Sequence, residues 1–166
     1  MWSVLMDYFQ RYPAQEKIAR QLIQHGLRIR DGRVFAGSIE IADSALARAA
    51  GVDRRIVAAT IKTIQASPQL QKVFSNFHPT MHLKDVAPQL NWGVMEITVE
   101  DATTPGILAG VSNAIASRGL SIRQAIVDDP DFIEEPKLFV VTEAPVPPDV
   151  IPDVQKVRGV KSVTVY

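Results

Sequence analysis

The residues best suited to ligand chemistry lie directly after an apolar alternation at Val94–Val99. The run Asp101-Ala102-Thr103-Thr104-Pro105-Gly106 leads into an amphipathic segment that begins with Ile107-Leu108. A Pro-Gly pair at the head of a helix leaves backbone N–H groups unpaired, and the helix dipole there favours a carboxylate or phosphate. Gly106 has no side chain, so a small molecule can approach the backbone closely. With Asp101 as an acceptor for an ammonium group, the run predicts a zwitterion site, although Pro-Gly is also an ordinary way to begin a helix.

The elements around this run follow from its periodicity. Residues 94–99 alternate between apolar and polar side chains, which predicts a half-buried strand. Thr104 is expected to be the N-cap of the following helix, with Pro105 at its first position. Gly119 is expected to end the helix, and residues 121–127 return as a strand. Ser121, at the opening of that strand, is expected to lie near the Pro-Gly turn.

The remaining segments complete a compact α+β pattern. Residues 138–141 are apolar on both faces, residues 147–157 have helical periodicity, and residues 160–166 alternate again. The order strand–helix–strand–strand–helix–strand predicts a ferredoxin-like domain with a four-stranded antiparallel sheet and both helices on one face. Because 138–141 has apolar residues on both sides, the other face needs a cover, either the N-terminal domain or a second copy. A homodimer is therefore expected.

The N-terminal part contains a second pattern, typical of a helix-turn-helix. A helix capped at residue 43 or 44 is followed by Gly51 and by a second helix that Asp53 caps. Small Ala47, Gly51 at the bend and Val57 between the helices have the spacing of this motif. The second helix presents Arg54, Arg55 and Lys62 outward, which is a face for the major groove of DNA. The same geometry also occurs in proteins that never bind nucleic acid.

A basic hairpin precedes this motif. Residues 27–35 alternate around an Asp-Gly turn and carry Arg28, Arg30 and Arg33. This hairpin is either a wing that contacts phosphates or a solvated surface. Residues 1–10 predict a further short helix, with Trp2, Leu5, Met6 and Phe9 on one face.

Composition limits the function classes. The 166 residues carry no net charge, but residues 1–78 hold 11 basic and 6 acidic side chains and residues 79–166 hold 7 and 12. This asymmetry is expected when only one half meets a polyanion. There is no cysteine, no secretory leader pattern and no apolar run long enough to span a bilayer, so a cytoplasmic location is expected. His78 and His82 are separated by Pro79 and lack a carboxylate–histidine motif, so neither a metal nor a cofactor is expected.

The stretch from Gly93 to Tyr166 resembles an ACT domain, a small ligand-binding module of amino-acid metabolism. Asp101, Thr104-Pro105-Gly106-Ile107-Leu108 and Gly119-Leu120-Ser121-Ile122 carry the likeness. Many ACT domains have Asn at the position of Ser121 and a loop two residues shorter before Pro-Gly. Most of the chain is similar to a family of archaeal predicted regulators of amino-acid metabolism, in which an ACT domain follows a helix-turn-helix-like region. The segments of this chain that carry the likeness to this family most specifically are Gly51–Arg55, Phe74–Asn76, Asp85–Pro88, Ile122–Ala125 and Glu135–Leu138.

The resemblance implies a helix-turn-helix-like domain at 1–78, a connector at 79–92 and an ACT domain at 93–166. Within it, Ile122, Arg123 and Gln124 either help to line a ligand pocket between subunits or lie exposed on an edge strand. The main hypothesis is a DNA-binding regulator that responds to a small molecule, expected to be an amino acid. The alternative is a module that docks on a metabolic enzyme and senses amino acids without DNA. An enzyme is not expected, because the chain has no nucleophile elbow, P-loop or dinucleotide glycine signature.

Overall fold

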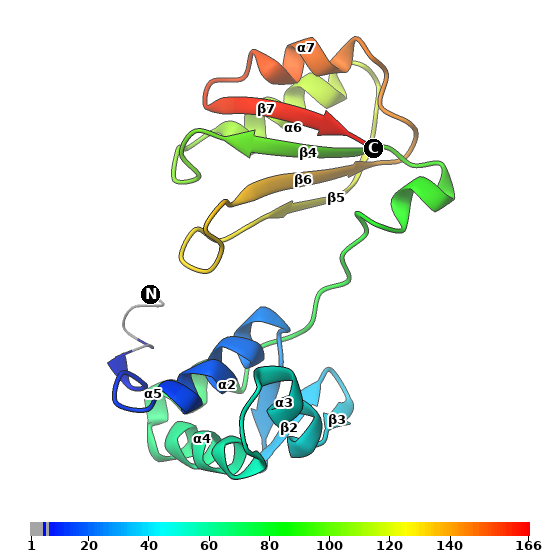
Figure 1. Ribbon diagram of the computed structural model, residues 1–166. Helices are drawn as coiled ribbons and strands as arrows, with labels where there is room; N and C mark the ends of the chain where they lie inside the picture. Colours follow the sequence, from blue (N-terminus) through cyan, green and yellow to red (C-terminus); the bar gives the residue numbers. More distant parts are fainter. Residues whose placement is uncertain (1–4, 6) are drawn as a thin grey trace. The chain divides into compact units, whose positions relative to one another are not determined.

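The computed structural model describes residue 5 and residues 7–166, and the chain divides into two compact units between Met81 and His82 (Figure 1). The helix expected over residues 1–10 lies partly outside the described residues. The boundary between the two units falls inside the connector expected at 79–92, because residues 79–81 belong to the N-terminal unit and residues from His82 onward pack with the C-terminal unit.

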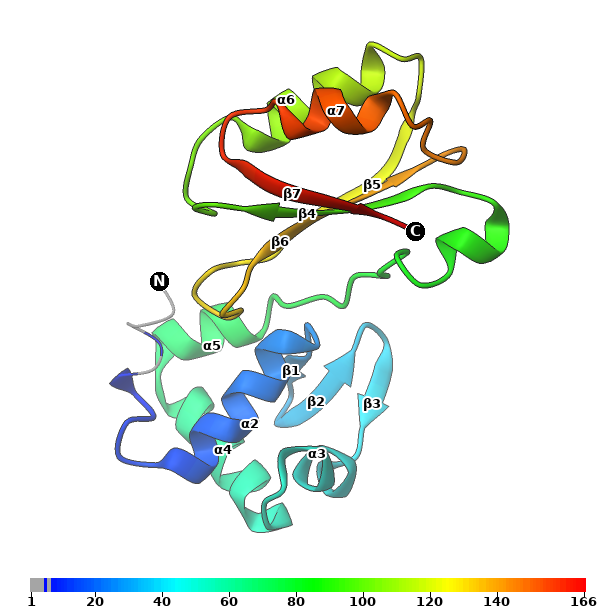
Figure 2. The same cartoon turned by 45° about the horizontal axis from the view of Figure 1, so that its top comes forward.

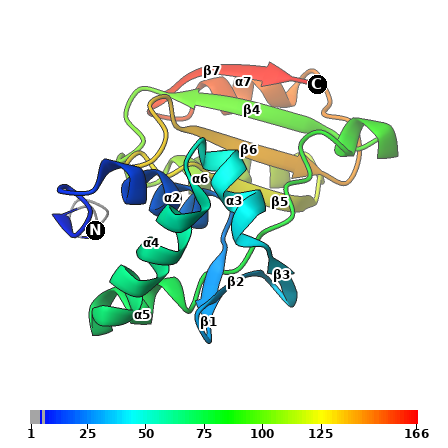
Figure 3. The same ribbon diagram turned by 60° about the horizontal axis from the view of Figure 1, so that its bottom comes forward.

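The N-terminal unit is a group of helices with a small sheet (Figure 3). Its helices are α2 (Pro13–Gln24), α3 (Asp43–Ala50), α4 (Arg54–Ala66) and α5 (Pro68–Phe74). Helix α4 is central, because it contacts α2, α3 and α5. The fully buried side chains of Ile18, Leu22, Val57, Ile64 and Phe74 form much of the core.

Helices α3 and α4 confirm the helix-turn-helix expected from the sequence. Gly51 ends α3 with a φ of +65°, a left-handed conformation that a residue with a Cβ adopts only with strain. Asp53 caps α4 by accepting a hydrogen bond from the amide of Arg55 at 2.8 Å. Ala47 and Val57 are both buried between the helices.

The basic hairpin is part of a three-stranded antiparallel sheet. Its strands are β1 (Arg28–Arg30), β2 (Arg33–Ala36) and β3 (Ile39–Ile41). Asp31 and Gly32 have φ values of +51° and +73°, as a type I′ turn requires. Sequence analysis missed β3, because a strand of three residues, each at least partly exposed, has almost no burial pattern.

The C-terminal unit confirms the ferredoxin-like prediction. Its elements are β4 (Val94–Val99), α6 (Ile107–Ala116), β5 (Ile122–Val127), β6 (Lys137–Thr142), α7 (Val150–Gln155) and β7 (Val160–Val165). The strand order is β5-β6-β4-β7, and all neighbours are antiparallel. Helices α6 and α7 lie together on one face of the sheet (Figures 1 and 2). Met95, Ile97 and Val140 face these helices and form the main core.

Part of the opposite, helix-free face of the sheet, around Val94 and Val141, is covered by residues 82–92, which we call the strap. The strap contains one turn of 3-10 helix, η1 (Ala87–Leu90), and Leu83, Ala87 and Trp92 pack against Val94 and Val141. The apolar residues on this side of β6 are therefore covered by the chain that precedes β4. This corrects the expectation that the N-terminal domain or a second copy covers them, so the homodimer stays a prediction without that support. Among the described residues, no helix is both long and apolar enough to cross a membrane.

Candidate functional site

The turn before α6 is the centre of the candidate site. The helix begins at Ile107, and Gly106 is its N-cap with a φ of +92°. Sequence analysis was wrong to place Thr104 at the cap and Pro105 inside the helix, because the loop continues to Gly106. Among the described residues, no side chain caps the first amides of α6. These backbone donors are thus available at the positive end of the helix dipole.

Asp101 stabilises the loop that leads to these amides. Its Oδ1 accepts hydrogen bonds from the Thr103 hydroxyl at 2.7 Å and from the Thr103 amide at 2.8 Å. These two bonds, the hydroxyl first, lower the pKa of the Asp101 carboxyl below its usual value. An ionised carboxylate offers about four acceptor sites, so Asp101 can still accept a hydrogen bond from an ammonium group.

A pocket of about 140 Å³ lies beside the turn. It is lined by main-chain and side-chain atoms of Val99, Ala102, Thr104, Gly106, Ile107, Leu108, Val127, Asp128, Pro136, Lys137 and Leu138. Most of these side chains are apolar, and an apolar cavity of roughly this size holds a molecule such as benzene. Leu108, near the start of α6, is 41% exposed and forms part of the pocket wall.

Four residues predicted for the site lie elsewhere. Strands β4 and β5 both pair antiparallel with β6, so they run in the same direction. Ser121 precedes β5, and its carbonyl accepts a hydrogen bond from the Glu143 amide beyond the end of β6, whereas Lys137 and Leu138 at the start of β6 line the pocket. Ser121 is therefore at the opposite end of the sheet from the turn, which corrects the prediction that it lies near it. Ile122 packs on the main core.

Arg123 and Gln124 contact the strap and do not line the pocket. The Arg123 guanidinium lies 4.0 Å from the centroid of the Trp92 ring, a cation–π geometry. The Gln124 Oε1 accepts a hydrogen bond from the Leu83 amide at 2.8 Å. Both side chains hold residues 82–92 on the sheet within this unit.

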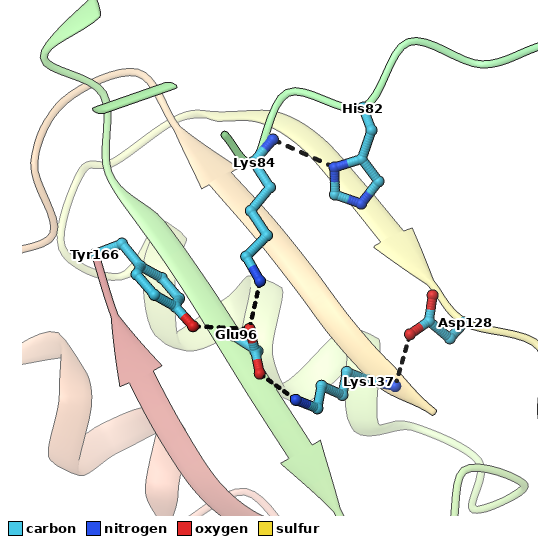
Figure 4. A network of polar contacts seen from close by, with 6 residues as sticks. All are labelled: His82, Lys84, Glu96, Asp128, Lys137 and Tyr166. Atoms are coloured by element: carbon cyan, nitrogen blue, oxygen red, sulfur yellow. Dashed lines mark hydrogen bonds and ion pairs between the residues drawn. The ribbon is translucent and has the colours of Figure 1, made fainter. Parts of the chain in front are cut away.

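A charged network lies on the helix-free face, in the middle of the sheet (Figure 4). Glu96 is only 8% exposed and accepts hydrogen bonds from Lys84 Nζ at 2.6 Å, from the Tyr166 hydroxyl at 3.0 Å and from Lys137 Nζ. The Lys137 ammonium, followed by the Lys84 ammonium, lowers the pKa of Glu96 to about 2. The hydrogen bonds to Glu96 raise the pKa values of Lys84 and Lys137.

Sequence reasoning missed three contributors to this region. In the sequence, Glu96 was only one of the polar residues that alternate with apolar ones in residues 94–99. The three residues that donate hydrogen bonds to it are 12, 41 and 70 positions away in the chain. Asp128 was part of an acidic loop, yet it lines the pocket and its Oδ2 accepts a hydrogen bond from the Lys137 amide at 3.2 Å. Lys137 belongs to both places, since it lines the pocket and binds Glu96.

Gly106 allows a direct test of the turn. A Cβ at Gly106 meets no heavy atom within 4 Å, so the cost of Gly106→Ala comes from the backbone alone. At a φ of +92° we expect the free energy of unfolding to fall by about 1–2 kcal/mol. Gly119→Ala, at a φ of +72° and with equally open surroundings, is the matched control at the other end of the helix.

Urea unfolding of both variants measures this cost. Equal stability of wild type and Gly106→Ala would contradict the left-handed turn. Only Gly106→Ala is expected to weaken ligand binding as well, because the Gly119 position is remote from the pocket.

The basic residues of the N-terminal unit differ in availability. Arg33 Nη1 donates to both Glu40 oxygens at 2.9 and 3.0 Å, and Arg55 Nε donates to Asp53 at 3.0 Å. The hydrogen bond from the Arg55 amide, followed by this side-chain contact, lowers the pKa of Asp53. These pairs reduce the charge that either arginine offers to a phosphate.

Arg28 and Arg30 also have partners inside the unit. Arg28 donates to the Gly37 carbonyl at 2.8 Å and lies 3.3 Å from the His78 Nε2, while Arg30 pairs with Asp31 at 3.3 Å. Within the described part of the chain, Arg54 and Lys62 are exposed and have no hydrogen-bond or ion-pair partner. They are the most available cations on α4.

Comparison with known proteins gives similarity to solved structures only. No protein-family model and no curated protein matches the sequence. A homoserine dehydrogenase from Thiobacillus denitrificans aligns with a TM-score of 0.36 and 14% identity, covering 68% of this chain and 27% of that one. This chain therefore spans about a quarter of the dehydrogenase.

Two further similar structures are an AsnC-family protein and an AsnC protein. A transcriptional regulatory protein of the AsnC family from Pyrococcus furiosus has a TM-score of 0.28 and 11% identity, covering 92% of this chain and 85% of that one. The AsnC protein of E. coli has a TM-score of 0.24 and 12% identity, covering 93% and 89%.

Proposed function

We propose that the protein is a ligand-responsive regulator of amino-acid metabolism, in which the C-terminal unit binds an amino acid and the helix-turn-helix unit binds DNA. The observation that carries the proposal is the pocket beside the uncapped amides of α6. The proposal assigns no catalytic reaction, no cofactor and no metal to this site.

The chemistry of the pocket favours an amino acid with an aliphatic side chain. A carboxylate would accept hydrogen bonds from the first amides of α6, where the helix dipole stabilises negative charge. An aliphatic side chain would bury itself against Val99, Leu108 and Leu138. Asp128, which lines the pocket, would supply the acceptor for the ammonium group, and Asp101 in the loop before the turn is the second candidate.

A thermal-shift screen of the wild-type protein against individual amino acids tests this part. A ligand that binds only the folded state stabilises it by about 2.7 kcal/mol at one hundred times its Kd. We expect the largest shift for an aliphatic amino acid and little for charged ones. No shift with any amino acid would contradict the sensor.

The DNA-binding part is supported by the exposed face of α4. Arg54 and Lys62 project from the second helix of the helix-turn-helix, the element that such motifs insert in the major groove. The neighbouring sheet β1–β3 would approach the phosphate backbone of the DNA, although its arginines are partly neutralised by Asp31 and Glu40.

The double variant Arg54→Ala/Lys62→Ala is expected to weaken binding to duplex DNA. Loss of two phosphate contacts should make the negative slope of log K against log salt shallower by about 1.8. Fluorescence anisotropy of labelled genomic fragments between low and moderate salt measures this slope. Arg158→Ala removes an exposed arginine of the C-terminal unit and is the matched control.

Two results would contradict the DNA-binding part of the proposal. One is wild-type protein that does not bind DNA at low salt, and the other is a double variant with an unchanged slope. The affinity for a specific operator is expected to differ with and without the amino acid, because a regulator requires coupling between its amino-acid site and its DNA site.

The alternative function is a sensor module that docks on a metabolic enzyme without DNA. The ion pairs Arg33–Glu40 and Arg55–Asp53 favour this alternative. They neutralise two arginines that a DNA-binding surface would keep free to contact phosphates. Co-purification with a biosynthetic enzyme, together with absent DNA binding at low salt, distinguishes this alternative.

A further inference from the structure

The strap, residues 82–92, is fixed to the C-terminal unit by directional contacts as well as by apolar packing. The Leu83 amide donates to Gln124, and the His82 ring meets the Phe139 ring edge-on with centroids 5.3 Å apart. Near the other end of the strap, Trp92 stacks under the Arg123 guanidinium. These contacts join the strap to β5 and β6.

Lys84 forms the strap's only ion pair with the sheet among the interactions described for residues 82–92. Its ammonium binds Glu96 and lies 4.7 Å from the Phe139 ring centroid and 5.0 Å from that of Tyr166. A cation held between two aromatic faces and a largely buried carboxylate is strongly localised. Glu96 therefore holds the first part of the strap.

Lys137, a residue that also lines the pocket, binds the same carboxylate. It is the first residue of β6, and it lines the pocket next to Pro136 and Leu138. Lys84 and Lys137 therefore share Glu96, with Lys84 on Oε2 and Lys137 on Oε1. A movement of Lys137 changes the charge balance that holds Lys84.

The chain just before the strap is also anchored, within the N-terminal unit. The His78 Nδ1 lies 3.0 Å from the Asn76 carbonyl, its Nε2 faces Arg28, and its carbonyl packs against Gly26 so closely that a Cβ there would lie 2.4 Å away. While the strap is in place, only residues 79–81 separate His78 from the stretch held on the sheet. If the strap detached, this separating segment would extend to residue 92.

We propose that residues 82–92 are a releasable latch, closed by the Lys84–Glu96 contact and coupled to the pocket through Lys137. The latch sets the length of chain that separates the two anchored stretches. Each released residue adds up to roughly 3.3–3.6 Å of reach, so opening changes how freely the N-terminal unit is tethered. Its use in regulation rests on the proposed function, because the occupant of the pocket is what would act on Lys137.

Hydrogen exchange of the Leu83 amide, followed by NMR in the full-length protein without ligand, tests the latch. Lys84→Met keeps a long side chain over the two rings and removes the charge, and we expect it to speed Leu83 exchange by about tenfold or more. Lys137→Met, which leaves every strap residue unchanged, is expected to speed it by about threefold or more. Lys161→Met, an exposed lysine on β7, is the matched control and should have no effect.

Amides of β4 and β6 serve as the internal reference, because unchanged exchange there shows that the sheet is intact. Wild-type exchange of Leu83 in Lys84→Met overturns the latch. Faster exchange in Lys84→Met but not in Lys137→Met overturns the coupling to the pocket. Since no ligand is present, neither result depends on whether the pocket binds an amino acid, which the thermal-shift screen decides separately.

Discussion

Replacing Glu96 with glutamine is expected to lower the free energy of unfolding of the C-terminal unit by about 2–3 kcal/mol at pH 7. The carboxylate accepts hydrogen bonds from two ammonium groups and a phenol, and the substitution removes its charge while both lysines remain. The lysine side chains are 26% and 30% exposed, so solvent screens part of the interaction. The expected loss in the free energy of unfolding is therefore smaller than the full pKa shift of Glu96 would give.

The stabilisation that Glu96 provides depends on pH, and the lowered pKa determines the direction of the change. The pKa of Glu96 is lowered from 4.5 to about 2 in the folded protein. A lowered pKa means that the unfolded chain binds the proton more readily, so the stabilisation is fully present above pH 4.5 and is lost as the pH falls towards 2. The difference in stability between wild type and Glu96→Gln should therefore shrink across that interval.

Urea unfolding monitored by Trp92 fluorescence in a Trp2→Phe background, at constant ionic strength, measures the difference at each pH. Glu100→Gln changes an exposed glutamate just beyond the end of β4 and is the matched control. A constant difference between wild type and Glu96→Gln from neutral to acid pH would contradict the assigned role of the carboxylate.

Filling the pocket is expected to abolish the response to amino acids. Ala102 is a partly buried loop residue that lines the pocket, and a phenylalanine there would occupy much of a space of about 140 Å³. The wild-type melting temperature should rise by roughly 10 °C at one hundred times the Kd, since about 2.7 kcal/mol is gained in a domain of this size. Ala102→Phe should show no rise with the same amino acid.

Ala109→Phe is the matched control, because Ala109 is exposed on the first turn of α6 and does not line the pocket. It should retain the wild-type rise. A full response in Ala102→Phe, or an equal loss in both variants, would place the amino acid elsewhere.

Local patterns were enough to predict the helix-turn-helix and the ferredoxin-like order of elements. Ala47, Gly51 and Val57 lie within eleven residues of one another, so their burial and the left-handed bend are set by neighbours in the chain. The alternation in β4 and the apolar β6 likewise follow from which residues must leave water.

The arrangement of the site depended on contacts between distant segments. Ser121 was misplaced because α6 carries the chain about 15 Å back along the sheet before β5 begins in parallel with β4. The end of β5, with Val127 and Asp128, therefore joins the turn in forming the pocket. Periodicity tells which face of an element is apolar, but it does not tell which ends of two strands meet.

The amino-acid sequence by itself determined the two kinds of unit and the bend at Gly51, because these follow from short-range sterics and hydrogen bonding. Only the tertiary structure decided that Glu96 is held by Lys84, Lys137 and Tyr166, and that the strap covers part of the sheet. A carboxylate enters a largely buried position only when its partners converge on it, and such convergence arises from the packing of the whole unit.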